Sequence, residues 1–96
     1  MRRAANLDSN HAAVVLALRA IGATVQSLAS MGGGVPDLLV GYRGRNVLLE
    51  VKDGEKPPSA RMLTKDEEEW HATWGGQVDT VYTAEDAQLT VIRLCA

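Results

Sequence analysis

Apolar and polar positions along the chain alternate with periods that predict interleaved helices and strands. Between residues 7 and 21 the apolar positions recur every three or four residues, which is typical of a helix over residues 8–21 with one buried face. We expect Asp8 or Ser9 to cap the start of this helix and Gly22 to end it. The apolar stripe comprises Leu7, His11, Val14, Leu18 and Ile21.

Three segments with strand-like patterns follow this helix. Residues 24–28 alternate between apolar and polar, whereas residues 37–42 and 46–52 are rich in aliphatic side chains. The sequence RGR at 43–45 predicts a hairpin turn between the last two strands. The glycines at 32–34 predict a flexible turn or a close backbone approach.

Residues 64–74 predict a second helix. Thr64 and Glu67 form a capping-box sequence at its start, and Trp70 and Trp74 lie one turn apart on one face.

Residues 77–82 predict a fourth strand, with Val78 and either Val81 or Tyr82 facing inward. For residues 84–94 the pattern fits a helix after a capping-box sequence, but the sequence LTVI also suits a strand. The predicted order is α-β-β-β-α-β followed by a short helix. This order indicates an α/β fold, a mixed sheet flanked by helices, in a single domain over residues 1–96.

The composition narrows the class of protein. With 46% hydrophobic and 23% charged residues the chain is globular rather than disordered. The lone Cys95 cannot form an intramolecular disulfide, and no apolar run approaches the roughly 18 residues that span a membrane. We therefore expect a cytoplasmic protein without a membrane segment.

Three charged residues are the candidates for chemistry: Asp37, Glu50 and Lys52. Glu50 and Lys52 are two residues apart on a predicted strand, so their side chains leave the same face while Val51 points into the core. If the hairpin pairs through 43–45, Asp37 falls opposite residue 51 or so, beside both of them. Two carboxylates at that separation suit Mg²⁺, and a neighbouring ammonium can orient water and stabilise a phosphoryl transition state.

The same spacing also fits an ordinary surface. Asp37 after Pro36 can be a turn residue, and Glu50 and Lys52 can form the charged face of an edge strand.

The segment GVPDLLVGYRGRNVLLEVKDG at 34–54 resembles the PD-(D/E)XK nuclease superfamily. The halves of that signature are Pro36-Asp37 and Glu50-Val51-Lys52, on either side of the predicted hairpin. Together with the following S…LT…E…W helix, the segment is similar to the VRR-NUC and Holliday-junction-resolvase-like branch of phage and bacterial genomes. The similarity covers residues 8–87 and implies a restriction-endonuclease-like core.

The resemblance implies a role for each residue of the motif. Asp37 and Glu50 would bind Mg²⁺ or Mn²⁺, the Val51 carbonyl would complete the coordination, and Lys52 would assist the attacking water. Members of the family often carry a further acid on the first helix, where Asp8 is the only carboxylate; Asp8 can equally cap that helix.

Glu67 stands where the family often has Gln, and it either caps its own helix or adds a second acid near the metal. Phosphate contacts are expected from the loops that flank the motif strands, although the same side chains also suit a solvated surface. These candidates are Arg43, Arg45, Lys56, Ser59 and Arg61.

The activity implied by the resemblance is that of a metal-dependent DNA endonuclease that leaves 5′-phosphate and 3′-hydroxyl ends. Branched DNA such as a Holliday junction is the favoured substrate, with flaps, nicks and plain duplex left open. A homodimer is expected, because symmetric cutting of two strands needs two sites related by a two-fold axis. The alternative is a catalytically weak or inactive nuclease-fold module that binds nucleic acid or a partner protein. The expected location is a bacterial cell or a phage-infected host.

The net charge of −2 conceals an uneven distribution. Residues 1–61 carry eight Lys and Arg against five acids, whereas residues 62–96 carry two against seven. A weakly acidic total therefore does not exclude DNA as a partner. It predicts that binding depends on a metal ion and weakens with salt.

Overall fold

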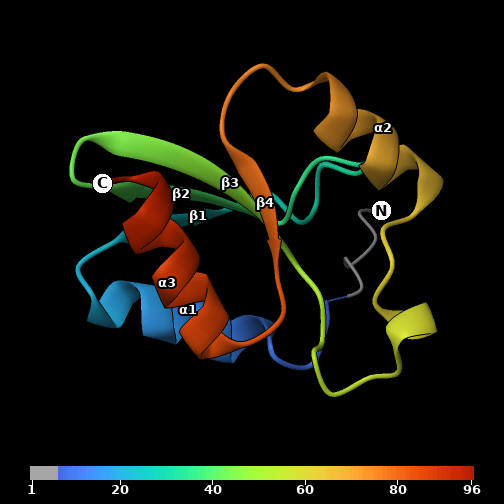
Figure 1. Ribbon diagram of the computed structural model, residues 1–96, viewed down its shortest axis with the longest axis horizontal. Helices are drawn as coiled ribbons and strands as arrows, with labels where there is room; N and C mark the ends of the chain where they lie inside the picture. Colours follow the sequence, from blue (N-terminus) through green and yellow to red (C-terminus); the bar gives the residue numbers. More distant parts are fainter. Residues whose placement is uncertain (1–6) are drawn as a thin grey trace.

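A four-stranded mixed sheet with three α-helices forms the protein, seen in a computed structural model that describes residues 7–96 (Figure 1). The predicted order of elements is confirmed, and residues 84–94 are helical. Among residues 7–96, none of the helices has the length and hydrophobicity of a membrane-spanning segment. The elements are α1 (His11–Ala20), β1 (Thr24–Ser27), β2 (Leu38–Tyr42), β3 (Arg45–Val51), the 3-10 helix η1 (Pro58–Ala60), α2 (Lys65–Thr73), β4 (Val78–Val81) and α3 (Ala84–Leu94).

The strands lie in the order β1-β2-β3-β4, antiparallel except for β4, which runs parallel to β3. Arg43 and Gly44 form the turn between β2 and β3 with φ of 53° and 79°, values typical of a tight two-residue hairpin. This turn pairs Leu38 with Leu49. Continuing that register places Asp37 opposite Glu50, one residue earlier than the sequence predicted.

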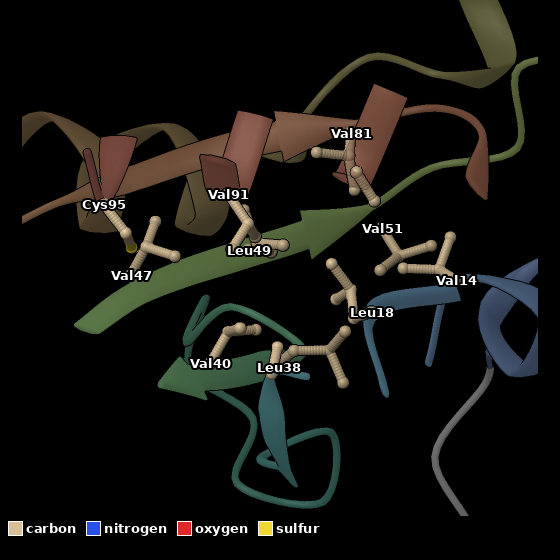
Figure 2. Packing of buried hydrophobic residues seen from close by; sticks show 12 residues of the cluster. Val14, Leu18, Leu38, Val40, Val47, Leu49, Val51, Val81, Val91 and Cys95 are labelled. Atoms are coloured by element: carbon tan, nitrogen blue, oxygen red, sulfur yellow. The ribbon is translucent and has the colours of Figure 1, made fainter. Parts of the chain in front are cut away.

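Helices α1 and α3 pack against one face of the sheet (Figure 1) and enclose the hydrophobic core there (Figure 2). Alternate residues of β3 supply its centre: Val47, Leu49 and Val51 are at most 1% exposed. On β4 the inward residue is Val81, so this alternative of the prediction is correct, and Tyr82 faces outward at 37% exposure. The expectation that Val78 also faces inward is wrong, because Val78 pairs with Leu48 and lies outside the core.

The start of α1 differs from the prediction. Neither Asp8 nor Ser9 caps the helix, because the N-cap is Asn10, which makes no side-chain cap bond. The Asn10 amide instead donates to the carbonyls of Lys52 and Tyr82, at 3.1 and 3.0 Å, and ties α1 to the ends of β3 and β4. Leu7 precedes the helix and is 50% exposed, so it lies outside the apolar stripe.

Helix α3 forms because its apolar side completes the core. Ala87 and Val91 are fully buried against the sheet and α1. Thr83 caps the helix, because its side chain accepts from the Asp86 N–H. In a capping box the Asp86 carboxylate would accept from the Thr83 N–H, but here it accepts from the N–H of the preceding residue, Tyr82.

Helix α2 lies apart from α1 and α3 (Figure 1) and has no buried residue. Its predicted capping box between Thr64 and Glu67 is confirmed, and the rings of Trp70 and Trp74 stack with centroids 4.5 Å apart. Gly34 has a φ of 85°, and a Cβ at this position would overlap the Asp66 carbonyl at the start of α2. The glycine thus allows the loop before β2 to approach α2 closely.

The two neighbouring glycines provide a matched test of this approach. Gly33 also has a positive φ, of 66°, but open space surrounds it. We expect Gly33→Ala to lower the free energy of unfolding by about 1–2 kcal/mol, the conformational cost alone. Gly34→Ala should cost clearly more, because it also displaces α2. Urea denaturation measures both; equal losses would show that the close approach contributes nothing.

Candidate functional site

Asp37, Glu50 and Lys52 meet where β2 begins and β3 ends. The Asp37 Oδ2 accepts from the Val51 N–H at 2.8 Å, which fixes its carboxylate against β3. Glu50 is 3% exposed on the face of the sheet opposite the core, and its Oε2 lies 4.0 Å from the Lys52 Nζ. The predicted grouping of two carboxylates and one ammonium is therefore present in the structure.

Glu67 of α2 is the fourth member of this group. Its Oε1 accepts from the Lys52 Nζ at 2.8 Å and from the Thr64 N–H at 2.9 Å. One carboxylate thus caps α2 and fixes the lysine. Of the two roles considered for Glu67 in the sequence, capping is confirmed, and the structure adds an ion pair with Lys52.

Burial and crowding by like charges make Glu50 hard to ionise. Desolvation, a hydrogen bond with Asp37, and the negative charges of Asp37 and Glu67 raise the pKa of Glu50 to about 10, against the opposing effect of Lys52. Its Oε1 is buried without a hydrogen-bond partner. At neutral pH Glu50 therefore keeps a proton beside Asp37 unless a cation takes the place of that proton.

The ion pair between Lys52 and Glu67 favours the charged form of both groups. Burial alone would lower the pKa of Lys52, but the hydrogen bond and charge of Glu67 outweigh it and the pKa rises. Burial would raise the pKa of Glu67, yet the hydrogen bond from Lys52 leaves it lowered. Both groups remain charged at neutral pH.

The donors at this site fit a hard cation that keeps several waters. Residues 7–96 contain no cluster of three or more His, Cys, Asp and Glu side chains arranged to hold a metal ion. Mg²⁺ characteristically binds one or two carboxylates and completes its shell with waters and phosphate oxygens. Asp37 and Glu50 supply two carboxylates, and because the N–H and C=O of a strand residue point to the same side, the Val51 carbonyl lies on the side of Asp37.

Asp8 does not cap α1, and its role as a further acid near the metal stays a prediction. Its carboxylate accepts from the Lys56 Nζ at 3.1 Å in a partly exposed ion pair. Ser9 likewise bonds to Asp53 at 2.7 Å. These contacts attach the segment before α1 to the loop after β3.

The expected phosphate-binding residues divide into two groups. Arg43 and Arg45 lie at the tip of the β2–β3 hairpin, at the opposite end of β3 from Glu50 and about 17 Å away at the usual rise of a strand. Lys56, Ser59 and Arg61 lie in the segment after β3, on the side of the candidate site. Arg2 and Arg3 belong to the eight Lys and Arg of residues 1–61, but they lie outside the described residues.

Two residues on the side of the candidate site were not identified from the sequence. Thr80 pairs with Glu50 across the parallel β3–β4 ladder, and Tyr82 follows at the end of β4. Both line an open pocket of about 560 Å³. The apolar-polar alternation of the fourth strand placed Thr80 on one face, but no local pattern indicates which strand lies next to Glu50.

No family model, curated protein or solved structure matches this chain. The geometry of the site therefore carries the functional argument.

The raised pKa of Glu50 predicts a pH-dependent penalty on stability. Between pH 4.5 and about 10 the folded protein keeps a proton that the unfolded chain releases, so this contribution to stability is lost as pH rises through that window. Glu50→Gln removes the effect. We expect the variant to gain stability over the parent in EDTA, by up to about 1.4 kcal/mol for each pH unit.

Urea denaturation at pH 5, 7 and 9 measures this difference. Glu69→Gln controls for the loss of one exposed negative charge. An advantage of Glu50→Gln that stays constant across the three pH values would contradict the assignment.

Proposed function

We propose that the chain is a metal-dependent DNA endonuclease of the PD-(D/E)XK superfamily, with a restriction-endonuclease-like fold. The observation that carries the proposal is the grouping of Asp37, fixed by the Val51 N–H, with the buried Glu50 beside the Lys52 ammonium. The α-β-β-β-α-β order and the mixed sheet support it, because the resemblance implies a core of this kind.

Asp37, Glu50 and the Val51 carbonyl are the groups that would hold Mg²⁺ or Mn²⁺. The ion, when bound, lowers the pKa of a water and neutralises charge on a phosphodiester oxygen. The unpartnered Oε1 of Glu50 is available as a ligand once its proton leaves. Asp37 is held in place by the Val51 N–H, so one of the two carboxylates is preorganised.

Lys52 acts as an ammonium rather than as a base. Its pKa is raised, so it remains protonated and donates to the attacking water and to the phosphate oxygens as negative charge develops. Glu67 is a positioning residue: it holds the Lys52 Nζ at the site without itself touching the reacting phosphate.

The candidate site lies close to the start of α2, where Glu50 is 3% exposed and the Lys52 side chain 12%. The ion pair with Glu67 keeps the Lys52 Nζ at this place.

Branched DNA is the proposed substrate and a homodimer the proposed active form. The basic excess of residues 1–61 provides charge for the DNA backbone, and one domain carries one site. Two copies related by a two-fold axis would cut the two strands symmetrically. The resemblance to junction resolvases supports both points.

Lys52→Ala should retain the fold and lose cleavage of four-way-junction DNA by roughly 10²- to 10³-fold in Mg²⁺, because transition-state charge is left unstabilised. Lys65→Ala removes an equal charge from the exposed first turn of α2 and should leave cleavage unchanged. Gel assays with Mg²⁺, Mn²⁺ and EDTA on junction, flap and linear DNA, with circular dichroism for folding, provide the measurement. Shifted bands without any cut product would favour the non-catalytic module instead.

Substitution of Glu67 separates a positioning residue from a metal ligand. Glu67→Gln keeps an acceptor for Lys52 and for the Thr64 N–H, so we expect cleavage within a few-fold of the parent and an unchanged metal affinity. Glu67→Ala removes the acceptor and should lower kcat, with the larger effect in kcat than in KM. Metal affinity from isothermal titration decides between the roles: a loss in Glu67→Gln would identify Glu67 as a ligand.

A further inference from the structure

We infer that the open pocket next to Glu50 binds one unpaired nucleobase, so that the substrate class is DNA with an unpaired nucleotide beside the scissile phosphodiester. This inference rests on the proposed function and specifies its substrate.

The pocket adjoins the candidate site. It has a volume of about 560 Å³ and lies between the segment at 58–63, the first turns of α2, and β4. Thr80 in its wall is the ladder partner of Glu50, and partners in adjacent strands project to the same face about 4.8 Å apart. A strand whose phosphate lies at Glu50 and Lys52 therefore has its neighbouring base within reach of the pocket.

The walls of the pocket suit a flat aromatic ligand. Tyr82 is 37% exposed, and the Arg61 guanidinium lies over its ring at 6.0 Å from the centroid. Met62 and Leu63 add apolar surface. Aromatic rings, arginine planes and thioethers are the groups on which single-stranded bases stack, regardless of sequence.

The polar groups around the pocket favour a base over a phosphate. The Glu68 carboxylate lies in its lining and repels phosphate oxygens, whereas the exocyclic amine of a base can donate to it. Thr80 contributes a hydroxyl group. The Arg61 guanidinium, which lies over the Tyr82 ring, adds N–H donors for a base acceptor.

A base in continuous duplex is stacked on both sides, and extruding it costs a few kcal/mol. An unpaired base, as in a flap, a fork or the open centre of a junction, carries little of that cost. The pocket therefore favours DNA with an unpaired nucleotide over uninterrupted duplex.

The test uses a labelled single-stranded pentanucleotide and the same strand with a central abasic site. Binding to the full chain is measured by fluorescence anisotropy in Ca²⁺, with the strand checked by gel to be intact. We expect the abasic strand to bind the parent at least about fivefold more weakly, the lower end of what one stacked base contributes. In Tyr82→Leu the two strands should bind alike, because the stacking ring is gone.

Tyr42→Leu is the matched control. Tyr42 also lies under an arginine, Arg43, at 5.5 Å, but at the hairpin tip away from the pocket. This variant should still discriminate against the abasic strand. Equal binding of both strands by the parent protein, or loss of discrimination in Tyr42→Leu as well, would overturn the inference.

Cleavage distinguishes the failure of this inference from that of the proposed function. In Mn²⁺ the parent should cut a forked DNA at least fivefold faster than fully paired DNA of the same sequence. Equal rates would overturn the substrate class and leave the nuclease intact. No product from either DNA would overturn the proposed function, and the binding experiment alone would then decide what the pocket takes.

Discussion

Strand β3 imposes the constraint on which the rest of the structure depends. Its odd-numbered residues Val47, Leu49 and Val51 form the centre of the core, and Glu50 projects from its other face. A register slip of one residue would exchange these faces and bury charge in the core. The two-residue turn at Arg43 and Gly44 fixes that register, so the same short hairpin determines both packing and the placement of Asp37 beside Glu50.

The carboxylate pair is maintained at the expense of stability. A buried Glu50 next to Asp37 would ionise only at high pH, and its Oε1 has no hydrogen-bond partner. A hydrophobic residue here would pack without that penalty. Strongly perturbed carboxyls of this kind concentrate at functional sites, since a cation or substrate supplies the missing interaction. This physical cost, rather than the motif alone, supports a role in chemistry.

Polar contacts attach the start of α2 to the rest of the structure. The helix buries none of its residues, but Glu67 joins its cap to Lys52, and Gly34 admits the loop before β2 to its first turn. The start of α2 therefore lies beside both Lys52 and the pocket lined by Glu68, Thr80 and Tyr82.

The sequence by itself determined the order of elements, the hairpin turn, the capping box of Thr64 and Glu67, and the common face of Glu50 and Lys52, because each follows from contacts between residues near in the chain. The expected helix cap at Asp8 or Ser9 is wrong, because both side chains bind residues that are distant in the sequence.

Only the tertiary structure decided the rest. Residues 84–94 form a helix because this conformation buries Ala87 and Val91 together in the core. Parallel pairing with β4 brought Thr80 beside Glu50, and docking of α2 brought Glu67 to Lys52. These contacts join segments that are distant in the sequence, and local periodicity carries no information about which segments meet.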